Sequence, residues 1–195
     1  MILTESLDFI EKNLREPITR RDIADHCFVS LSMLEKLFRY ALGYSIKEYI
    51  ERRRMTLAAY DIAHRGLSVT EGAMKYQYNS VEVFSRSFRR VWNVSPSEFT
   101  EKWKFTGIFP KINFRYKEGE EIYMARKRVD INEAYEYLLI RCGSYVLCFD
   151  GVHFMKFNEV SRKAGDMAII EMASRIDRAA GDDMQVMRIG GDEFA

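Results

Sequence analysis

Residues Asn79–Phe99, NSVEVFSRSFRRVWNVSPSEF, encode a helix, a tight reversal and the start of a second helix. Ser80 is a suitable N-cap, because its side chain can accept the free backbone N–H groups of the first turn. After the reversal, Ser95, Pro96 and Glu98 form a capping box that starts the next helix. Helical periodicity places an apolar face opposite a polar and basic one. The apolar face consists of Val81, Phe84, Phe88 and Val91, and the polar face of Glu82, Ser85, Arg86, Arg89 and Arg90.

This segment alone supports two interpretations. A short helix with a packed back and a basic front fits the major groove of DNA. The same pattern also fits a surface helix of an all-α domain whose charged face is simply solvated. The rest of the chain has to distinguish the two.

The first hundred residues contain this pattern twice, with an offset of 50 residues between Ser30 and Ser80. Each copy consists of a short helix, a turn, a second helix and a capped following helix, which is a helix-turn-helix pattern. One long helix over residues 46–64 joins the copies, so two second helices facing the same way would enter successive major-groove segments, about 34 Å apart. Two matched polar faces, whose relative position is fixed by the helix that joins them, favour the DNA-binding interpretation. The matching residues are Thr19, Ala24, Ser30, Leu34, Phe38, Arg39, Ser45, Glu48 and Tyr49 in the first copy, and Ser68, Ala73, Ser80, Phe84, Phe88, Arg89, Ser95, Glu98 and Phe99 in the second.

Helix start and stop signals predict an all-α organisation for residues 1–104. Capping-box sequences occur at Thr19–Asp22, Ser45–Glu48 and Ser68–Glu71. Gly43 and Gly66 are suited to helix C-termini, because glycine adopts positive φ without steric cost. Seven helices are predicted, near residues 4–14, 20–27, 31–42, 46–64, 69–76, 81–91 and 96–104.

Composition excludes several classes of protein. The 195 residues are 47% hydrophobic, enough for a substantial core. No apolar run approaches the ~18 residues of a membrane span, and the acidic start, Met1–Leu14, does not resemble a signal peptide. Cys27, Cys142 and Cys148 fit neither a disulfide framework nor a zinc site, which predicts thiols in a reducing cytoplasm. The net charge is only +1, so any DNA contact must come from local basic clusters such as Arg52–Arg54.

Residues 8–100 resemble the DNA-binding domain of AraC-type transcription regulators. The resemblance implies a sequence-specific regulator that binds double-stranded DNA with both second helices. It is carried by Ile23-Ala24, Ser30, Leu34, Phe38, Gly43, Tyr49-Ile50, Arg54, Ala58, Ala73, Tyr76, Tyr78, Ser80, Phe84-Ser85-Arg86, Phe88-Arg89-Arg90 and Ser95-Pro96-Ser97. By position it assigns base reading to Ser32, Glu35 and Lys36 in the first unit and to Val81, Glu82, Ser85 and Arg86 in the second.

The chemistry of these residues suits DNA. Lys36 and Arg86 can donate to guanine, carboxylates can accept from cytosine N4, and Val81 can contact a thymine methyl. Arg39, Arg89 and Arg90 could hold phosphates.

Two residues depart from the AraC-type pattern, both shortly before the second helix of the second unit. Gly72 stands where a β-branched apolar residue is usual, and we expect it to leave space in the core and to cost about 1 kcal/mol relative to alanine. Gln77 stands where the turn usually has glycine, and a positive φ there would cost a further ~1 kcal/mol. The second unit is therefore expected to be the less rigid one.

Beyond a linker at residues 105–129, residues 130–195 have a mixed α/β pattern. Tyr145–Phe149 is an apolar run that predicts a buried strand, and Gln185–Ile189 predicts a second. Gly190-Gly191 is a hairpin signal before a third strand over residues 192–195. Helices are predicted near residues 130–141, 154–163 and 167–180. The predicted fold class is therefore mainly α with a C-terminal α/β part.

This second half resembles the beginning of a GGDEF (diguanylate cyclase-like) domain. The carriers are Phe149-Asp150, Phe154, Asn158, Gly165-Asp166, Ala173, Ile176 and, above all, Arg188–Phe194 (RIGGDEF). The resemblance implies that Asp150 and Asp192 hold Mg²⁺, with Glu193 beside them, and that Asn158 and Asp166 contact guanine. Apart from Mg²⁺ for a bound nucleotide, no cofactor is implied.

Departures from the GGDEF pattern argue against catalysis. Val152 replaces a second acid, Met155 replaces a phosphate-binding lysine, and the later strands of such a domain have no counterpart. We therefore expect a non-enzyme, and a chain that is a piece of a longer product. The C-terminal half is interpreted as a regulatory or homodimerisation module, or alternatively as a degenerate domain that binds GTP or a cyclic dinucleotide as effector.

Overall fold

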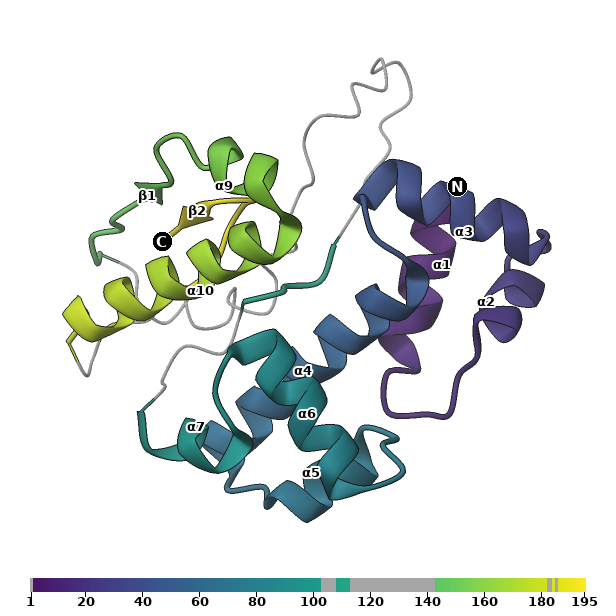
Figure 1. The fold of residues 1–195 in the computed structure, drawn as a ribbon, viewed down its shortest axis with the longest axis horizontal. Coiled ribbons are helices and arrows are strands. Elements are labelled where there is room, and N and C mark those ends of the chain that lie inside the picture. Colours follow the sequence, from purple (N-terminus) through teal and green to yellow (C-terminus); the bar gives the residue numbers. More distant parts are fainter. Residues whose placement is uncertain (1, 103–107, 113–142, 182–183, 185) are drawn as a thin grey trace.

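The computed structural model describes residues 2–102, 108–112, 143–181, 184 and 186–195 (Figure 1). Within these residues, a first part is all-helical and a smaller second part combines helices with short strands. None of the described helices has the length and hydrophobicity that a membrane crossing requires. The first part contains α1 (Ile2–Lys12), α2 (Arg20–His26), α3 (Leu31–Leu42), α4 (Ile46–Arg65), α5 (Val69–Lys75), α6 (Val81–Trp92) and α7 (Pro96–Lys102), and the second contains β1 (Phe149–Asp150), α9 (Met155–Val160), α10 (Arg162–Ala179) and β2 (Glu193–Phe194).

The helices predicted for the first part are confirmed, because their local start and stop signals work as expected. Thr19, Ser45 and Ser68 each accept a backbone N–H from three residues on, and the acid at that position bonds back to the cap. Gly43 and Gly66 end α3 and α4 with φ of 77° and 65°, the left-handed conformation that favours glycine. Local sequence thus sets the length of each helix.

The first helix-turn-helix unit has its own hydrophobic core. α1, α2 and α3 pack with the first half of α4, and Ile23, Leu34, Phe38 and Ile46 are fully buried between them. This packing fixes the orientation of α3 about its axis.

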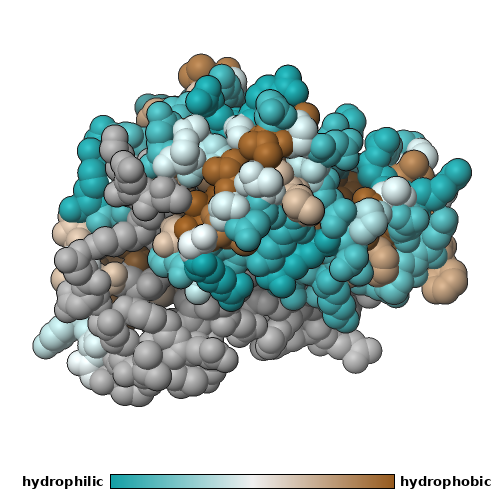
Figure 2. All heavy atoms as spheres, turned by 90° about the horizontal axis from the view of Figure 1, so that it is seen from below, coloured by the Kyte–Doolittle hydropathy of each residue, from teal (hydrophilic) through white to brown (hydrophobic). Residues whose placement is uncertain are grey.

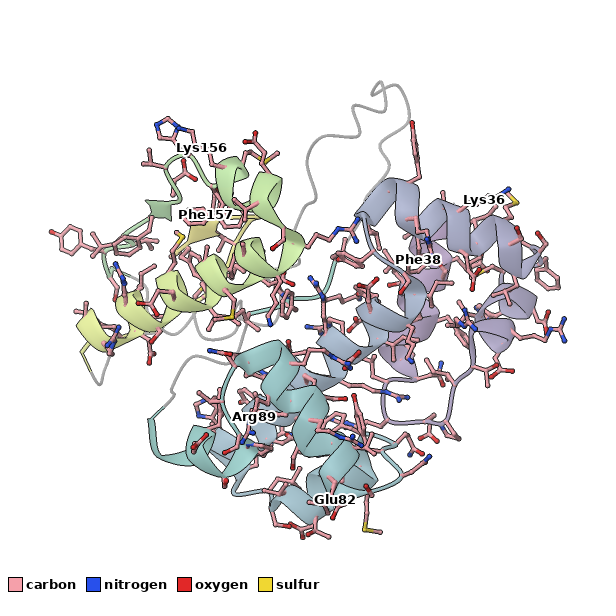
Figure 3. The ribbon with its side chains drawn as sticks, in the orientation of Figure 1. Lys36, Phe38, Glu82, Arg89, Lys156 and Phe157 are labelled. Carbon is pink, nitrogen blue, oxygen red and sulfur yellow. The ribbon has the colours of Figure 1, made fainter. Side chains whose placement is uncertain are left out.

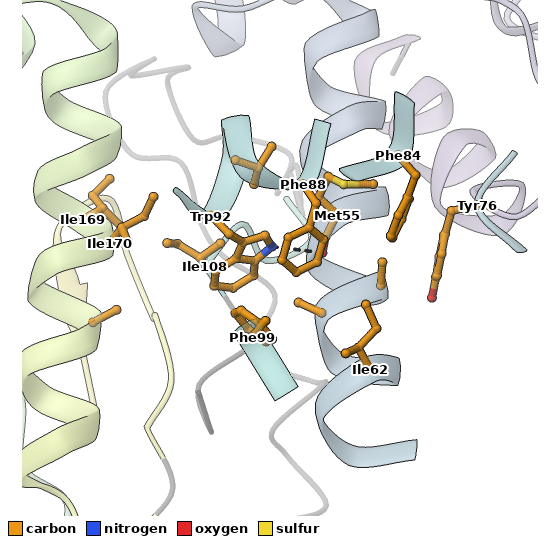
Figure 4. Close-up of a cluster of buried hydrophobic side chains, with 14 of the residues drawn as sticks. Met55, Ile62, Tyr76, Phe84, Phe88, Trp92, Phe99, Ile108, Ile169 and Ile170 are labelled. Atoms are coloured by element: carbon orange, nitrogen blue, oxygen red, sulfur yellow. Dashed lines mark hydrogen bonds between the residues drawn. The ribbon is translucent and has the colours of Figure 1, made fainter. Parts of the chain in front are cut away.

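The second unit shares its core with the C-terminal part. Phe88 and Trp92 of α6 are fully buried, and the Trp92 indole N–H donates to the Met55 carbonyl of α4 at 3.1 Å (Figure 4). Ile108 and, from α10, Ile169 belong to the same cluster. The C-terminal part is therefore packed against the second unit.

The space expected beside Gly72 is absent. The ring of Phe84 occupies it: a Cβ atom on Gly72 would lie 3.2 Å from Phe84 Cζ, and Phe84 is fully buried. The expectation of a void was wrong because an aromatic ring from α6 reaches across to α5. Glycine still disfavours α5 through backbone entropy, but no cavity adds to that cost.

Gln77 has a φ of 64°, the condition under which a strain cost was predicted for it. Phe28, at the matching turn of the first unit, also has a positive φ, of 54°, and its side chain is 94% exposed. Because neither glycine nor asparagine stands at position 28, the sequence pattern does not mark this turn as one with a positive φ. A non-glycine residue in this region is strained by about 1–2 kcal/mol, so both turns, and not the second alone, carry strain.

Replacing Gln77 by glycine is expected to raise the free energy of unfolding by about 0.5–1 kcal/mol, because glycine removes the strain of positive φ. The gain is reduced by loss of the hydrogen bond from Gln77 Nε2 to the Arg15 carbonyl, 2.7 Å long. Urea unfolding measures the change. Gln77→Ala is the matched control, since it loses the same hydrogen bond but keeps the strain; a glycine variant no more stable than the alanine variant would contradict the prediction.

The C-terminal part has an antiparallel sheet of two strands in the described residues. Phe149 lies opposite Phe194, and Asp150 lies opposite Glu193. The predicted hairpin at Gly190-Gly191 forms, since Arg188 bridges to Phe194 across it. The hairpin thus brings the end of the chain beside β1.

Some expected elements of this part differ in extent. Of the predicted buried strand Tyr145–Phe149 only Phe149 pairs, and Tyr145 is 99% exposed, because pairing with the two-residue β2 does not extend further back. Of the predicted strand Gln185–Ile189, only Arg188 makes a bridge, and Gln185 lies outside the described residues. α10 begins at Arg162 rather than near 167, because Ser161 caps it by accepting the Ala164 N–H at 3.0 Å. The predicted helix 130–141 also lies outside the described residues.

Candidate nucleic-acid interface and C-terminal cavity

α3 and α6 each bury one face and expose the other. In α3, Phe38 lies in the core, whereas Lys36 lies on the opposite, outer side (Figure 3). In α6, Phe88 is buried, whereas Glu82 and Arg86 are exposed. The predicted reading faces are therefore the solvent faces of the two second helices.

In the first unit, the predicted DNA-contacting side chains differ in their exposure and in whether they already have an ion-pair partner. Ser32, Lys36 and Arg39 are exposed, and Lys36 and Arg39 make no recorded hydrogen bond or ion pair to another described residue. Glu35 is half-buried and forms an ion pair with Arg20 of α2, 2.5 Å long. A base contact by Glu35 would therefore compete with Arg20, whereas Lys36 can donate without breaking a bond.

The same distinction holds in the second unit. Arg86 and Arg89 are exposed and have no recorded hydrogen-bond or ion-pair partner within the described part of the chain. A hydrogen bond with Ser80 lowers the pKa of Glu82 and keeps it an acceptor. Arg90 forms an ion pair with Glu51 of α4. Arg90 thus also links α6 to α4. Its predicted role was to contact a DNA phosphate, and this structural role was not predicted. The two remaining predicted readers, Val81 and Ser85, are half-buried beside these residues.

A groove of about 630 Å³ lies between α6 and the first unit. Five basic side chains and one acidic one line it: Arg20, Lys47, Arg54, Arg86 and Arg90, with Glu51. When the molecule of Figure 1 is viewed from below, the face that is seen is mainly hydrophilic (Figure 2). Positive potential between the two helices predicted to read DNA would suit the phosphate backbone that crosses from one major-groove segment to the next.

Arg20 of α2 and Lys47 of α4 were not among the predicted DNA contacts, because they lie far apart in the chain, whereas Arg54 belongs to the predicted basic cluster Arg52–Arg54. Two N–H groups of Arg54 donate to the Leu14 and Glu16 carbonyls, at 2.8 and 2.7 Å. Arg54 therefore holds the segment after α1 in place as well as adding charge to the groove.

A second cavity, of about 390 Å³, lies between α4 and the C-terminal part. It brings together Asn158 and Asp166, the two residues predicted to contact guanine, with Gly190 and Gly191 of the hairpin. Burial raises the pKa of the Asp166 carboxyl, although Arg52 and Arg188 nearby lower it. Asn158 Oδ1 lies where a Cβ atom on Gly165 would be, so glycine at that position lets α9 approach α10 closely.

The two acids predicted to hold Mg²⁺ lie at one end of the small sheet. The Gly151 N–H donates to the Asp192 carbonyl at 3.1 Å, which brings Asp150 close to Asp192. The described residues contain no group of three or more potential metal ligands. Two carboxylates are too few to bind Mg²⁺ unaided, since the ion prefers six oxygens and commonly takes some from substrate phosphates.

The chain is similar to named transcription regulators. It is 36% identical over 96 residues to the HTH-type transcriptional activator AarP of Providencia stuartii, covering 49% of this chain and 71% of that protein. It is 32% identical over 122 residues to the putative HTH-type transcriptional regulator YkgA of Escherichia coli (strain K12), covering 62% of this chain but only 51% of YkgA. A solved AraC-type regulator from Chromobacterium violaceum is 29% identical, with a TM-score of 0.50 over 52% of this chain and 90% of that one.

Two helix-turn-helix units on one long helix define a tandem helix-turn-helix protein. A family model described as a helix-turn-helix domain matches residues 23–102. The chain belongs to the AraC-type family of helix-turn-helix transcription regulators. The matched segment ends before the C-terminal part, so the family says nothing about that part.

Proposed function

We propose that this protein is a sequence-specific transcription regulator that reads two successive major-groove segments of double-stranded DNA with α3 and α6. The observation that carries the proposal is the pair of matched helices, each with a buried apolar face and an exposed polar one. Because residues of α4 belong to both cores, this helix fixes the position of one reading face relative to the other. The name of AarP, a transcriptional activator, supports this function. The C-terminal part then serves as a regulatory or dimerisation module.

Selection of bound duplexes from a random pool tests DNA reading, and we expect a site with two half-sites about one helical turn apart. Arg86→Ala should weaken binding to that site by about 1–3 kcal/mol and relax the preference at one base pair, because Arg86 can donate to guanine O6 and N7. Lys12→Ala, at the end of α1, is the control for loss of one charge. If no sequence is enriched from the pool at moderate salt, the proposal is contradicted.

A second candidate function is binding of a guanine nucleotide by the C-terminal part. The observation that favours it is the cavity shared by Asn158, Asp166 and Gly190-Gly191. A carboxylate can accept from both N–H donors of a guanine edge. If the nucleotide carries Mg²⁺, Asp150 and Asp192 would supply two of its oxygen ligands.

A further inference from the structure

One ion pair links the DNA-reading part to the cavity of the C-terminal part. Arg52 of α4 donates from Nη2 to Asp166 Oδ2 at 2.7 Å and from Nη1 to Oδ1 at 3.2 Å, so both carboxylate oxygens of this α10 residue are engaged. The side chains are only 18% and 31% exposed. Partial burial and the two-point geometry make this pair stronger than a solvated surface pair.

Aromatic rings hold the guanidinium of Arg52 in a defined plane. Its Cζ atom lies 5.2 Å from the ring centroid of Tyr44 and 4.7 Å from that of Phe109. Both distances are within the range of cation–π attraction. The binding position at Asp166 is therefore a slot for a flat group with two adjacent N–H donors on one edge.

The surroundings of this slot favour a ligand with a negative charge. Four arginines line the cavity against a single acid, Asp166. Glu11 neutralises Arg53. Three N–H groups of Arg188 donate to backbone carbonyls, which carry no net charge, and Asp166 and Asp192 offset part of the charge of Arg188 through space. Arg162, at the start of α10, is exposed. A planar donor edge bound at Asp166 would thus have an anionic group attracted by the arginines.

We propose that Arg52 occupies the binding position of the base of a guanine nucleotide, and that Arg52 and the nucleotide compete for Asp166. The inference rests on the nucleotide site proposed above and adds its regulation. Guanine presents the N1–H and the exocyclic amine side by side, as the guanidinium presents two N–H groups. A nucleotide that displaces Arg52 breaks the ion pair between α10 and α4, the helix that carries both reading units, so nucleotide binding is coupled to the docking of the C-terminal part.

Calorimetric titration of the intact chain with GDP tests the competition. Wild-type protein should bind GDP, and Arg52→Met, which keeps the length of the side chain but cannot donate, should bind it at least tenfold more tightly. Asp166→Asn should bind at least tenfold more weakly, and so should wild-type protein titrated with inosine diphosphate, which lacks the amine. Arg65→Met, at the far end of α4, is the matched control and should bind like wild type.

The outcomes separate the inference from the site on which it rests. Equal affinities of wild type and Arg52→Met would leave the nucleotide site standing and overturn the competition. Flat heats with every variant would overturn both. Arg52→Gln, a smaller disturbance, provides the same comparison if Arg52→Met does not fold, with circular dichroism as the check on folding.

Discussion

Replacing Lys36 and Arg86 together by alanine is expected to weaken binding to the selected DNA site by about 2–6 kcal/mol. Each side chain can make a base contact worth about 1–3 kcal/mol. The two lie on different helices with separate cores, so their effects should add. Both are exposed and free of recorded partners among the described residues, so their removal should not disturb the fold.

Fluorescence anisotropy with labelled duplex at fixed salt measures this loss, since affinities at different salt concentrations cannot be compared. The control is the double variant Arg175→Ala/Arg178→Ala, which removes the same charge from the exposed face of α10. It should bind nearly like wild type. A double variant no weaker than Arg86→Ala alone would show that α3 does not read bases, and the two-segment proposal would fall.

Replacing Arg53 by alanine is expected to lower the free energy of unfolding by about 3–5 kcal/mol, because removing one partner of a buried ion pair leaves an uncompensated charge. Arg53 of α4 is 1% exposed. It donates to both carboxylate oxygens of Glu11 in α1, at 2.8 and 3.0 Å, and to the Phe109 carbonyl at 2.6 Å. The Tyr49 hydroxyl donates to the same Glu11 carboxylate at 2.7 Å. One side chain thus connects α1, α4 and the segment around Phe109.

Urea unfolding followed by circular dichroism measures this loss, with Arg39→Ala as the exposed-arginine control. Glu11→Ala should also destabilise, and the double variant should lose less than the sum of the two single losses, because the charges compensate each other. Strict additivity would contradict the ion-pair explanation. A loss below about 1 kcal/mol, typical of solvated pairs, would do the same.

The helices and their exposed faces could be predicted because the signals for them are local. Ser80 begins α6, Asn93 ends it with a φ of 61°, and Phe84 and Phe88 mark its buried side. Such signals act within one or two turns, and helical periodicity then determines which residues are exposed.

The roles of residues whose partners are distant in the chain could not be predicted from local pattern. At Gly72 the sequence suggests a void, but the ring of Phe84 fills that space. Arg90 looked like a phosphate ligand, yet it pairs with Glu51, which is 39 residues away. Sequence pattern indicates that such a residue is polar and exposed, but it cannot identify the side chain opposite.

The amino-acid sequence was therefore sufficient for the seven helices, the duplication and the exposed faces of α3 and α6, because caps, glycine stops and periodicity operate between near neighbours. Tertiary structure alone decided how the halves meet: Trp92 and Ile169 share one core, and Arg52 binds Asp166 across 114 residues of chain. The physical reason is that a contact at that separation depends on how whole helices pack, and packing is a property of surfaces that form only when the chain has folded.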